Sequence, residues 1–305
     1  TGARGFIGKK LVEKLVRDGK NLRVLTRGEQ NAFDEISEQI DVWRGDLTKP
    51  STLSGIAEGI HTVYHLAGEI RNPRRFDSVN RQGTEHLLEQ CQAAKVRRFL
   101  YLSSVGVMGA KGESGVLDES DSTKPQNGYE ISKCAGEKLT LSVHNPKGMW
   151  TMAVRPTIVY GEGRNPNHDS FLSWIRLIKS GRFMQLGRDY ISSYVYVGDV
   201  AAACLSVAED SRTGGQVYII NEPIPLPIFI AYISAILDVP EPKALPKPIG
   251  RLAEGILRKT GRFASLYNRT TYSMDKLSDL GFILPYGYRR GLRRTINWYR
   301  EMNLL

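Results

Sequence analysis

The sequence predicts a doubly wound α/β fold, a parallel sheet covered by helices on both faces, with a smaller and mostly helical second lobe. One observation is the glycine-rich turn "TGARGFIG" at the start, which leads directly into a helical pattern. Another is the alternation of helical segments with short, almost continuously apolar segments up to Gly161, because such strands are buried on both faces. After Gly161, helical segments and proline-rich breaks replace this alternation.

The elements of the first lobe follow from local patterns. Apolar side chains recur at helical spacing from Ile7 to Val16, and Gly19 is a suitable helix C-cap. Further helices are expected at "STLSGIAEG", at "NRQGTEHLLEQCQAAK" and from about Tyr129 to His144. The expected strands are LRVLT, IDVWRGD, TVYHLAG, RRFLYLSS and WTMAVRPTIVYG.

The second lobe is expected to complete a substrate cleft. Its predicted helices are FLSWIRLIKSG, DVAAACLSVAED, LPIFIAYISAIL and IGRLAEGILRKTG, and its strand-like segment is GGQVYII. We expect a dinucleotide-binding domain at 1–161 and a substrate-binding lobe at 162–305, with the segment at about 193–222 packing back on the first domain.

Composition excludes several classes of protein. A chain of 305 residues with 41% hydrophobic residues can bury a substantial core, so it is not a disordered chain. No run of about 18 apolar residues occurs, so we expect no integral membrane segment. The three cysteines lie far apart in helical patterns, which suits free thiols in a reducing compartment and predicts a cytoplasmic location: Cys91, Cys134, Cys204. No Cys or His pair has metal-ligand spacing, so we expect no metal.

The net charge of +10 is compatible with nucleic acid, an anionic membrane surface or phosphate-bearing ligands as partners. No zinc-finger or RNA-binding signature occurs, so no nucleic-acid partner is expected. The basic stretch "YRRGLRRTINWYR" also carries apolar residues at helical spacing, which indicates an amphipathic helix with a solvated basic face.

The glycine turn indicates a phosphate site, because glycines let the backbone approach a phosphate and the helix N-terminus binds anions. About 24 residues after such a turn, a dinucleotide fold selects its adenosine ribose, often with a carboxylate. Here that position holds Thr26 and Arg27, and a guanidinium suits a 2′-phosphate. Arg4 offers a second cation. We expect NADP, with NAD possible; the alternative is that both arginines are solvated surface residues.

A serine and a Tyr-x-x-x-Lys pair indicate proton transfer at a carbinol or carbonyl oxygen. Tyr129 and Lys133 are four residues apart, so both project from one helix face. The ammonium, helped by a nicotinamide, is expected to lower the pKa of the phenol, and Ser104 to orient the substrate oxygen. A second such pair, Tyr272 and Lys276, lacks a preceding strand-borne serine, and we interpret it as structural.

In order and spacing, these motifs resemble the extended short-chain dehydrogenase/reductases, and the resemblance covers nearly the whole chain. It implies that "TGARGFIG" is the phosphate turn, "GDL" an adenine contact, "HLAG" a strand end beside the cofactor and "RPTIVYG" the sixth strand. The catalytic positions that it implies are Asn80, Ser104, Tyr129 and Lys133. Tyr129 and Lys133 are expected to bind the cofactor as well. The full set of expected cofactor-binding positions is Gly2, Arg4, Gly5, Phe6, Ile7, Gly8, Arg27, Asp46, Leu47, Leu66, Ala67, Gly68, Ser103, Tyr129, Lys133, Pro156 and Thr157.

The resemblance also implies a central strand immediately before Thr1, and a homodimer through the helices that contain Gln90 and Tyr129. We therefore expect that this sequence is an N-terminally shortened piece whose source encodes such a strand upstream.

Departures from the family pattern bear on the reaction. Sugar dehydratases of this family are similar to one another in having an Asp-Glu pair directly after the catalytic hydroxyl residue. In this chain Val105 and Gly106 occupy those two positions after Ser104. Ile158 and Ser192 stand where nucleotide-sugar members commonly carry Asn and Arg. The pattern is closest to the 3β-hydroxysteroid dehydrogenase and dihydroflavonol reductase branch.

Three functions stay open at this point. One is an NADP-dependent oxidoreductase that interconverts a secondary alcohol and a ketone, with a small, lipid-like or aromatic substrate. Phe171, Trp174 and Ile175 either line that substrate site or belong to the core. The second is a nucleotide-sugar epimerase with captive NAD. The third is a non-catalytic NADP-binding sensor, against which the complete Ser104, Tyr129 and Lys133 set argues.

Overall fold

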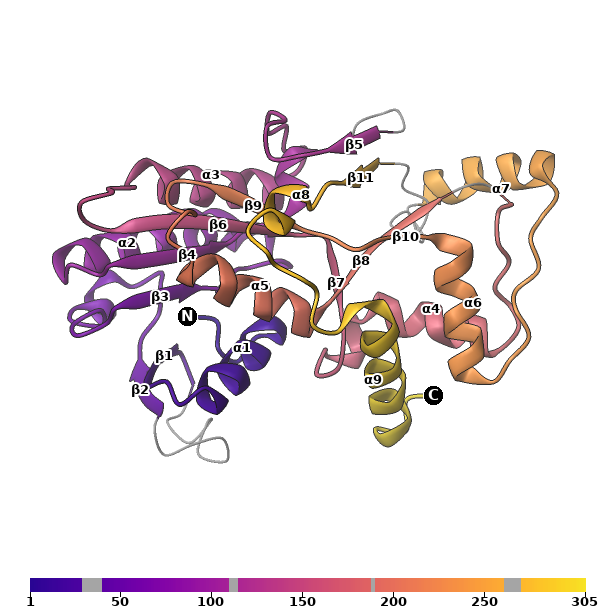
Figure 1. Cartoon of the computed structure of the whole chain (residues 1–305), viewed down its shortest axis with the longest axis horizontal. Coiled ribbons are helices and arrows are strands. Elements are labelled where there is room, and N and C mark those ends of the chain that lie inside the picture. Colours follow the sequence, from indigo (N-terminus) through magenta and orange to yellow (C-terminus); the bar gives the residue numbers. More distant parts are fainter. Residues whose placement is uncertain (29–39, 110–114, 188–189, 261–269) are drawn as a thin grey trace.

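The computed structural model describes residues 1–28, 40–109, 115–187, 190–260 and 270–305. Its main sheet contains four parallel strands in the order β3-β4-β6-β9. These strands are β3 (Thr62–His65), β4 (Arg98–Leu102), β6 (Trp150–Pro156) and β9 (Val217–Ile220). A second parallel pair, β1 (Leu22–Thr26) and β2 (Ile40–Arg44), lies beside the main sheet (Figure 1).

Helices cover the main sheet on both faces, so the predicted fold class is confirmed (Figure 1). Two helices, α1 (Phe6–Arg17) and α5 (Val197–Glu209), pack together on one face. The opposite face is covered by α2 (Gly83–Ala93) and α3 (Gly128–Ser142). The strands β4, β6 and β9 are almost entirely buried between these layers, as expected of a parallel sheet, whereas β3 is only partly buried.

The predicted helix at "STLSGIAEG" is wrong. The structure has only a 3₁₀ turn at Pro50–Leu53, followed by turns. Gly55 and Gly59 have φ angles of +81° and +73°, which a right-handed helix does not accommodate. The apolar side chains of this segment therefore pack in the core of the first lobe without forming an α-helix.

The predicted strand "WTMAVRPTIVYG" is divided at Thr157. Its first part is β6, and its second part, β7 (Ile158–Tyr160), belongs to another sheet. That sheet has the order β10-β8-β7, with β8 (Ile191–Tyr196) in the middle and β10 (Pro223–Pro225) at the edge. A further parallel pair joins β5 (Gly115–Leu117) to β11 (Thr270–Tyr272).

The second lobe is held together by an aromatic core between β8 and the helices α4 (Ser170–Lys179), α6 (Leu226–Leu237) and α9 (Gly287–Glu301). Trp174 and Phe229 stack with ring centroids 5.9 Å apart. Phe171, Trp174 and Ile175 are all at most 1% exposed, so the structure supports their interpretation as core residues. The remaining helices are α7 (Lys247–Thr260), toward the outer end of this lobe, and the short α8 (Asp275–Ser278) (Figure 1).

The three cysteines are buried and free, as predicted. In the described ranges, no helix is long and apolar enough to pass through a bilayer. Likewise, no group of three or more His, Cys, Asp and Glu side chains in those ranges is placed to hold a metal ion.

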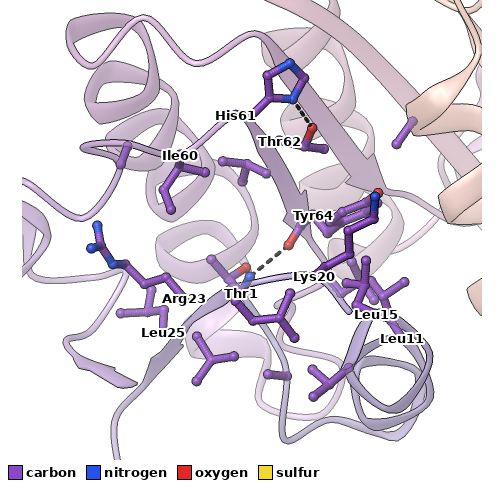
Figure 2. A pocket seen from close by; sticks show the side chains of 18 of the residues that line it. Thr1, Leu11, Leu15, Lys20, Arg23, Leu25, Ile60, His61, Thr62 and Tyr64 are labelled. Carbon is purple, nitrogen blue, oxygen red and sulfur yellow. Dashed lines mark hydrogen bonds between the residues drawn. The ribbon is translucent and has the colours of Figure 1, made fainter. Parts of the chain in front are cut away.

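A cavity of about 620 Å³ lies between β1 and β3, which do not pair with each other in the described part of the chain. Figure 2 shows that Leu11, Leu15 and Leu25 line it together with Ile60. At its end, the amino group of Thr1 donates a hydrogen bond to the carbonyl oxygen of Tyr64, at 2.8 Å.

Candidate functional site

The glycine turn brings the start of α1 against the end of β3. Gly2 has a φ angle of +76°, and a Cβ atom on it would lie 2.5 Å from the amide nitrogen of Ala67. A Cβ atom on Gly8 would overlap the carbonyl oxygen of Gly2, which also accepts a hydrogen bond from the amide of Gly5 at 2.8 Å. This turn therefore requires glycine at both positions for steric reasons. The first amides of α1 are thereby placed beside the loop at 66–68.

A second cavity, of about 570 Å³, opens at this turn. It lies where β1, β2 and β3 end, at the carboxyl edge of the strands, where α/β folds bind their ligands. Nine residues that the sequence analysis assigned to the cofactor line it: Gly2, Arg4, Gly5, Arg27, Asp46, Leu47, Leu66, Ala67 and Gly68. The structure thus brings four separate sequence segments together around one cavity.

Phe6, Ile7 and Gly8 are not among the residues that line this cavity. The Phe6 ring lies under the guanidinium of Arg164, 5.5 Å from its carbon, and Ile7 packs against the core clusters. Their side chains therefore connect α1 to the rest of the protein. A role of their backbone amides in binding a phosphate stays a prediction.

Cationic side chains gather at the end of β1. The Arg4 guanidinium reaches Gly28 so closely that a Cβ atom there would overlap it. Arg27 is exposed at the rim of the same cavity. The neighbouring Thr26 is buried, and its hydroxyl accepts a hydrogen bond from the Gly28 amide at 3.0 Å. Two guanidinium groups and a neutral hydroxyl therefore stand where an NAD site commonly has a carboxylate.

Arg75 also lines this cavity, and sequence reasoning missed it. It belongs to a 3₁₀ turn at Pro73–Arg75, and the only sequence signal was the basic stretch "RNPRRF" after β3. For Asp46, burial raises the pKa of the carboxyl, but hydrogen bonds from Thr48 and the charges of Arg27 and Arg75 outweigh burial and lower it. Asp46 is therefore ionised at neutral pH and counters part of this positive charge.

Ser104 and Tyr129 meet at the end of β4. Ser104 caps a 3₁₀ turn at Val105–Met108 by accepting a hydrogen bond from the Gly106 amide at 3.1 Å. Burial raises the pKa of the Tyr129 phenol, which a hydrogen bond with Ser104 partly offsets. Desolvation of the phenolate is thus the dominant influence on this pKa, and its lowering by the ammonium together with a nicotinamide stays a prediction.

Lys133 lies one helical turn after Tyr129 and is only 4% exposed. Its Nζ atom donates a hydrogen bond to the Leu102 carbonyl oxygen at 2.6 Å and lies 4.0 Å from the Tyr101 ring centroid. Burial lowers the pKa of this amine to about 7, against the charge of Glu137. Nζ also lies 3.7 Å from the position of a Cβ atom on Gly68, so Lys133 lies next to a residue that lines the second cavity.

Asn80 ties the two parts of the site together. It is buried in a π-helical turn at Asp77–Gln82, and its Oδ1 accepts a hydrogen bond from the Glu69 amide at 2.7 Å. Its Nδ2 donates to the Glu69 carbonyl and to the Ser132 hydroxyl, each at 2.9 Å. These contacts fix the loop after β3 against α3, so the geometry supports a positioning role.

Ser103, Pro156 and Thr157 are not among the residues that line the second cavity, and the same holds for the four predicted catalytic residues, Asn80, Ser104, Tyr129 and Lys133. The buried Ser103 hydroxyl has no hydrogen-bond partner among the described residues. Pro156 ends β6, and the buried Thr157 hydroxyl donates to the Asn221 side-chain oxygen at 3.2 Å. The second Tyr-Lys pair is divided between β11 and α8, which supports its interpretation as structural.

Comparison with known proteins identifies relatives with two kinds of activity. Residues 1–221 match the model of the NAD dependent epimerase/dehydratase family. The chain is 27% identical over 319 residues to the N-acetyl-alpha-D-glucosaminyl-diphospho-ditrans,octacis-undecaprenol 4-epimerase of Escherichia coli O157:H7, covering 97% of this chain and 93% of that protein. It is 30% identical over 256 residues to the decarboxylating sterol-4-alpha-carboxylate 3-dehydrogenase of Bos taurus, covering 79% of this chain and 70% of that protein.

Solved structures share the fold over nearly their whole length. The UDP-glucose 4-epimerase of Thermus thermophilus, in complex with NAD, superposes with a TM-score of 0.75 at 22% identity, covering 98% of this chain and 97% of that one. RMD of Pseudomonas aeruginosa, complexed with NADPH, superposes with a TM-score of 0.70 at 23% identity, covering 99% and 98%. These similarities agree with the α/β architecture described above.

Proposed function

The chain belongs to the NAD dependent epimerase/dehydratase family, and on this premise we propose that it is an NADP-dependent oxidoreductase that interconverts a secondary alcohol and a ketone. Two observations carry this proposal: Ser104 and Tyr129 are hydrogen-bonded to each other, and Lys133, one helical turn after Tyr129, lies beside Gly68. Gly68 lines the cavity that also holds Arg4 and Arg27. We assign residues 1–161 to dinucleotide binding and 162–305 to the substrate side, except for the segment at about 193–222, whose α5 and β9 pack on the first domain.

The residues of the cavity fit a dinucleotide. Gly2 and Gly8 leave no room for side chains, so the backbone turn can receive a pyrophosphate. Arg4 and Arg27 would pair with a 2′-phosphate, and Asp46 and Leu47 would flank the adenine. Lys133, which faces Gly68, would hold the ribose next to the nicotinamide. When bound, the nicotinamide supplies or accepts the hydride.

The chain's own residues would handle the proton. The Tyr129 phenol donates its proton to the substrate oxygen during reduction and accepts it during oxidation. Ser104 donates a hydrogen bond to the same oxygen and so orients it. The Lys133 ammonium stabilises the phenolate that forms, which lowers the cost of this transfer.

We propose a substrate with a large apolar part. One relative acts, by its name, on a sugar linked through a diphosphate to undecaprenol, and the other on a sterol carboxylate. These two molecules share an extended hydrocarbon portion. A substrate of this class fits a chain that has Ile158 and Ser192 where nucleotide-sugar enzymes commonly carry pyrophosphate partners.

A second candidate is an epimerase that retains NAD, which is favoured by the similarity to the Escherichia coli epimerase over 97% of this chain. The deciding experiment is to denature the purified protein and to identify and count the released dinucleotide. Protein that carries none and then binds NADPH far better than NADH supports the oxidoreductase. Stoichiometric NAD would overturn it in favour of the epimerase.

A further inference from the structure

Helix α7 directs its apolar face away from the protein. Ile249, Leu252 and Ile256 are spaced to lie on one side of the helix, and they are 54%, 70% and 57% exposed. The inward side carries Gly250, where a Cβ atom would overlap the Leu186 carbonyl oxygen, and the buried Glu254. This distribution is the reverse of that in an ordinary surface helix. Figure 1 shows α7 at the end of the molecule away from the main sheet.

An extended segment packs beside α7 and carries further exposed side chains. The backbone at 185 pairs with 243–245: the Gln185 amide donates to the Lys243 carbonyl at 3.0 Å, and the Leu245 amide donates to the Gln185 carbonyl at 2.8 Å. Met184, next to this pairing, is 49% exposed. We define the α7 patch as Arg182, Met184, Lys243, Lys247, Ile249, Leu252 and Ile256.

The α7 patch contains three exposed basic residues and no acidic residue. Arg182, Lys243 and Lys247 are exposed, and among the described residues near Lys243 in the chain Asp238 and Glu241 are exposed as well. The whole chain carries a net charge of +10, so it approaches an anionic surface favourably. Exposed aliphatic side chains bordered by basic residues on an amphipathic helix are typical of helices that lie in the interface of a bilayer.

We propose that the α7 patch docks the protein onto the surface of an anionic lipid bilayer. The aliphatic side chains of α7 would enter the boundary between headgroups and acyl chains, and Lys243 and Lys247 would pair with lipid phosphates. The helix has 14 residues, too few to span a bilayer, so it would lie parallel to the surface. This proposal does not depend on the cofactor or on the reaction proposed above.

The test is flotation of the full chain with vesicles of phosphatidylcholine and phosphatidylglycerol in equal amounts, and with vesicles of phosphatidylcholine alone. We expect flotation with the anionic vesicles and a strong reduction in high salt. The double variant Leu252→Glu/Ile256→Glu and the double variant Lys243→Glu/Lys247→Glu should each bind at least about tenfold more weakly.

The control is Ile283→Glu, since Ile283 is 82% exposed but lies outside the α7 patch, and it should float like the wild type. Thermal unfolding must be unchanged in each variant that is scored. Three results would overturn the proposal: no flotation of the wild type, equal flotation of the wild type and both double variants, or equal binding to neutral and anionic vesicles. A concentration-dependent dimer that Leu252→Glu/Ile256→Glu abolishes, without flotation, would instead assign the face to a second copy.

Discussion

The Nζ atom of Lys133 donates a hydrogen bond to the carbonyl oxygen of Leu102, at 2.6 Å. Leu102 is the last residue of β4, and Ser104 follows two positions later. Lys133 therefore fastens α3 to the strand end that carries the serine. Any change at Tyr129 acts within this fixed frame, so its effect on catalysis can be separated from an effect on the fold.

Replacement of Tyr129 by Phe should abolish the proton transfer while the ring is retained. We expect kcat to fall by about 10²- to 10⁴-fold, because a positioned general acid contributes on that scale. The affinity for NADPH, measured by fluorescence titration, should change little. Tyr272→Phe is the matched control and should keep full activity. Turnover by Tyr129→Phe at the wild-type rate would refute the assignment.

Replacement of Arg27 by Ala should separate the two cofactors. Loss of one charge-assisted hydrogen bond should weaken NADPH binding by about 1–3 kcal/mol and leave NADH almost untouched. Arg17→Ala, an exposed arginine on α1, should change neither affinity. Calorimetric titration of both cofactors measures the difference. An equal loss for NADPH and NADH would count against pairing with the 2′-phosphate.

Replacement of Gly8 by Ala should displace the glycine turn, because the added Cβ overlaps the Gly2 carbonyl oxygen. We expect dinucleotide affinity to fall by at least about tenfold, since the amides at the start of α1 would move away from the pyrophosphate. Gly255→Ala is the control: a Cβ there meets nothing within 4 Å. Wild-type affinity in Gly8→Ala would show that the turn does not hold the dinucleotide.

Replacement of Glu222 by Gln should raise stability in a pH-dependent manner. The Glu222 carboxylate accepts a hydrogen bond from the Tyr288 amide at 2.9 Å, in the first turn of α9. Burial raises the pKa of this carboxyl from 4.5 to about 7, despite that hydrogen bond, and the charge of Asp199 adds to the rise. Between these two pKa values the native state binds more protons than the unfolded state, so the carboxyl lowers stability as pH rises.

We therefore expect Glu222→Gln to be more stable than the wild type by roughly 1 kcal/mol at pH 8 and about equal to it at pH 4. Urea unfolding at both pH values measures this difference. Glu89→Gln, a change at an exposed position on α2, should show no such dependence. A gain of the same size at both pH values would show that burial of charge is not its cause.

Local patterns predict much of the candidate site. The glycine turn, the Arg27 position and the Ser104, Tyr129 and Lys133 set each depend on spacing within one segment and the following element. Arg75 could not be predicted in the same way, because its 3₁₀ turn reaches the cavity through a loop that carries no periodic pattern. The contacts of Asn80 with Glu69 likewise depend on a π-helical turn, which ordinary helical spacing does not indicate.

The sequence by itself determined the order of elements, the turn that only glycine can form and the family to which the chain is similar, because these depend on short-range sterics and periodicity. Tertiary structure decided that Trp174 is core, that Lys133 is a buried amine with a pKa near 7 and that Ile249, Leu252 and Ile256 face outward. These properties depend on which distant segments exclude water from a side chain, and neither spacing nor composition contains that information.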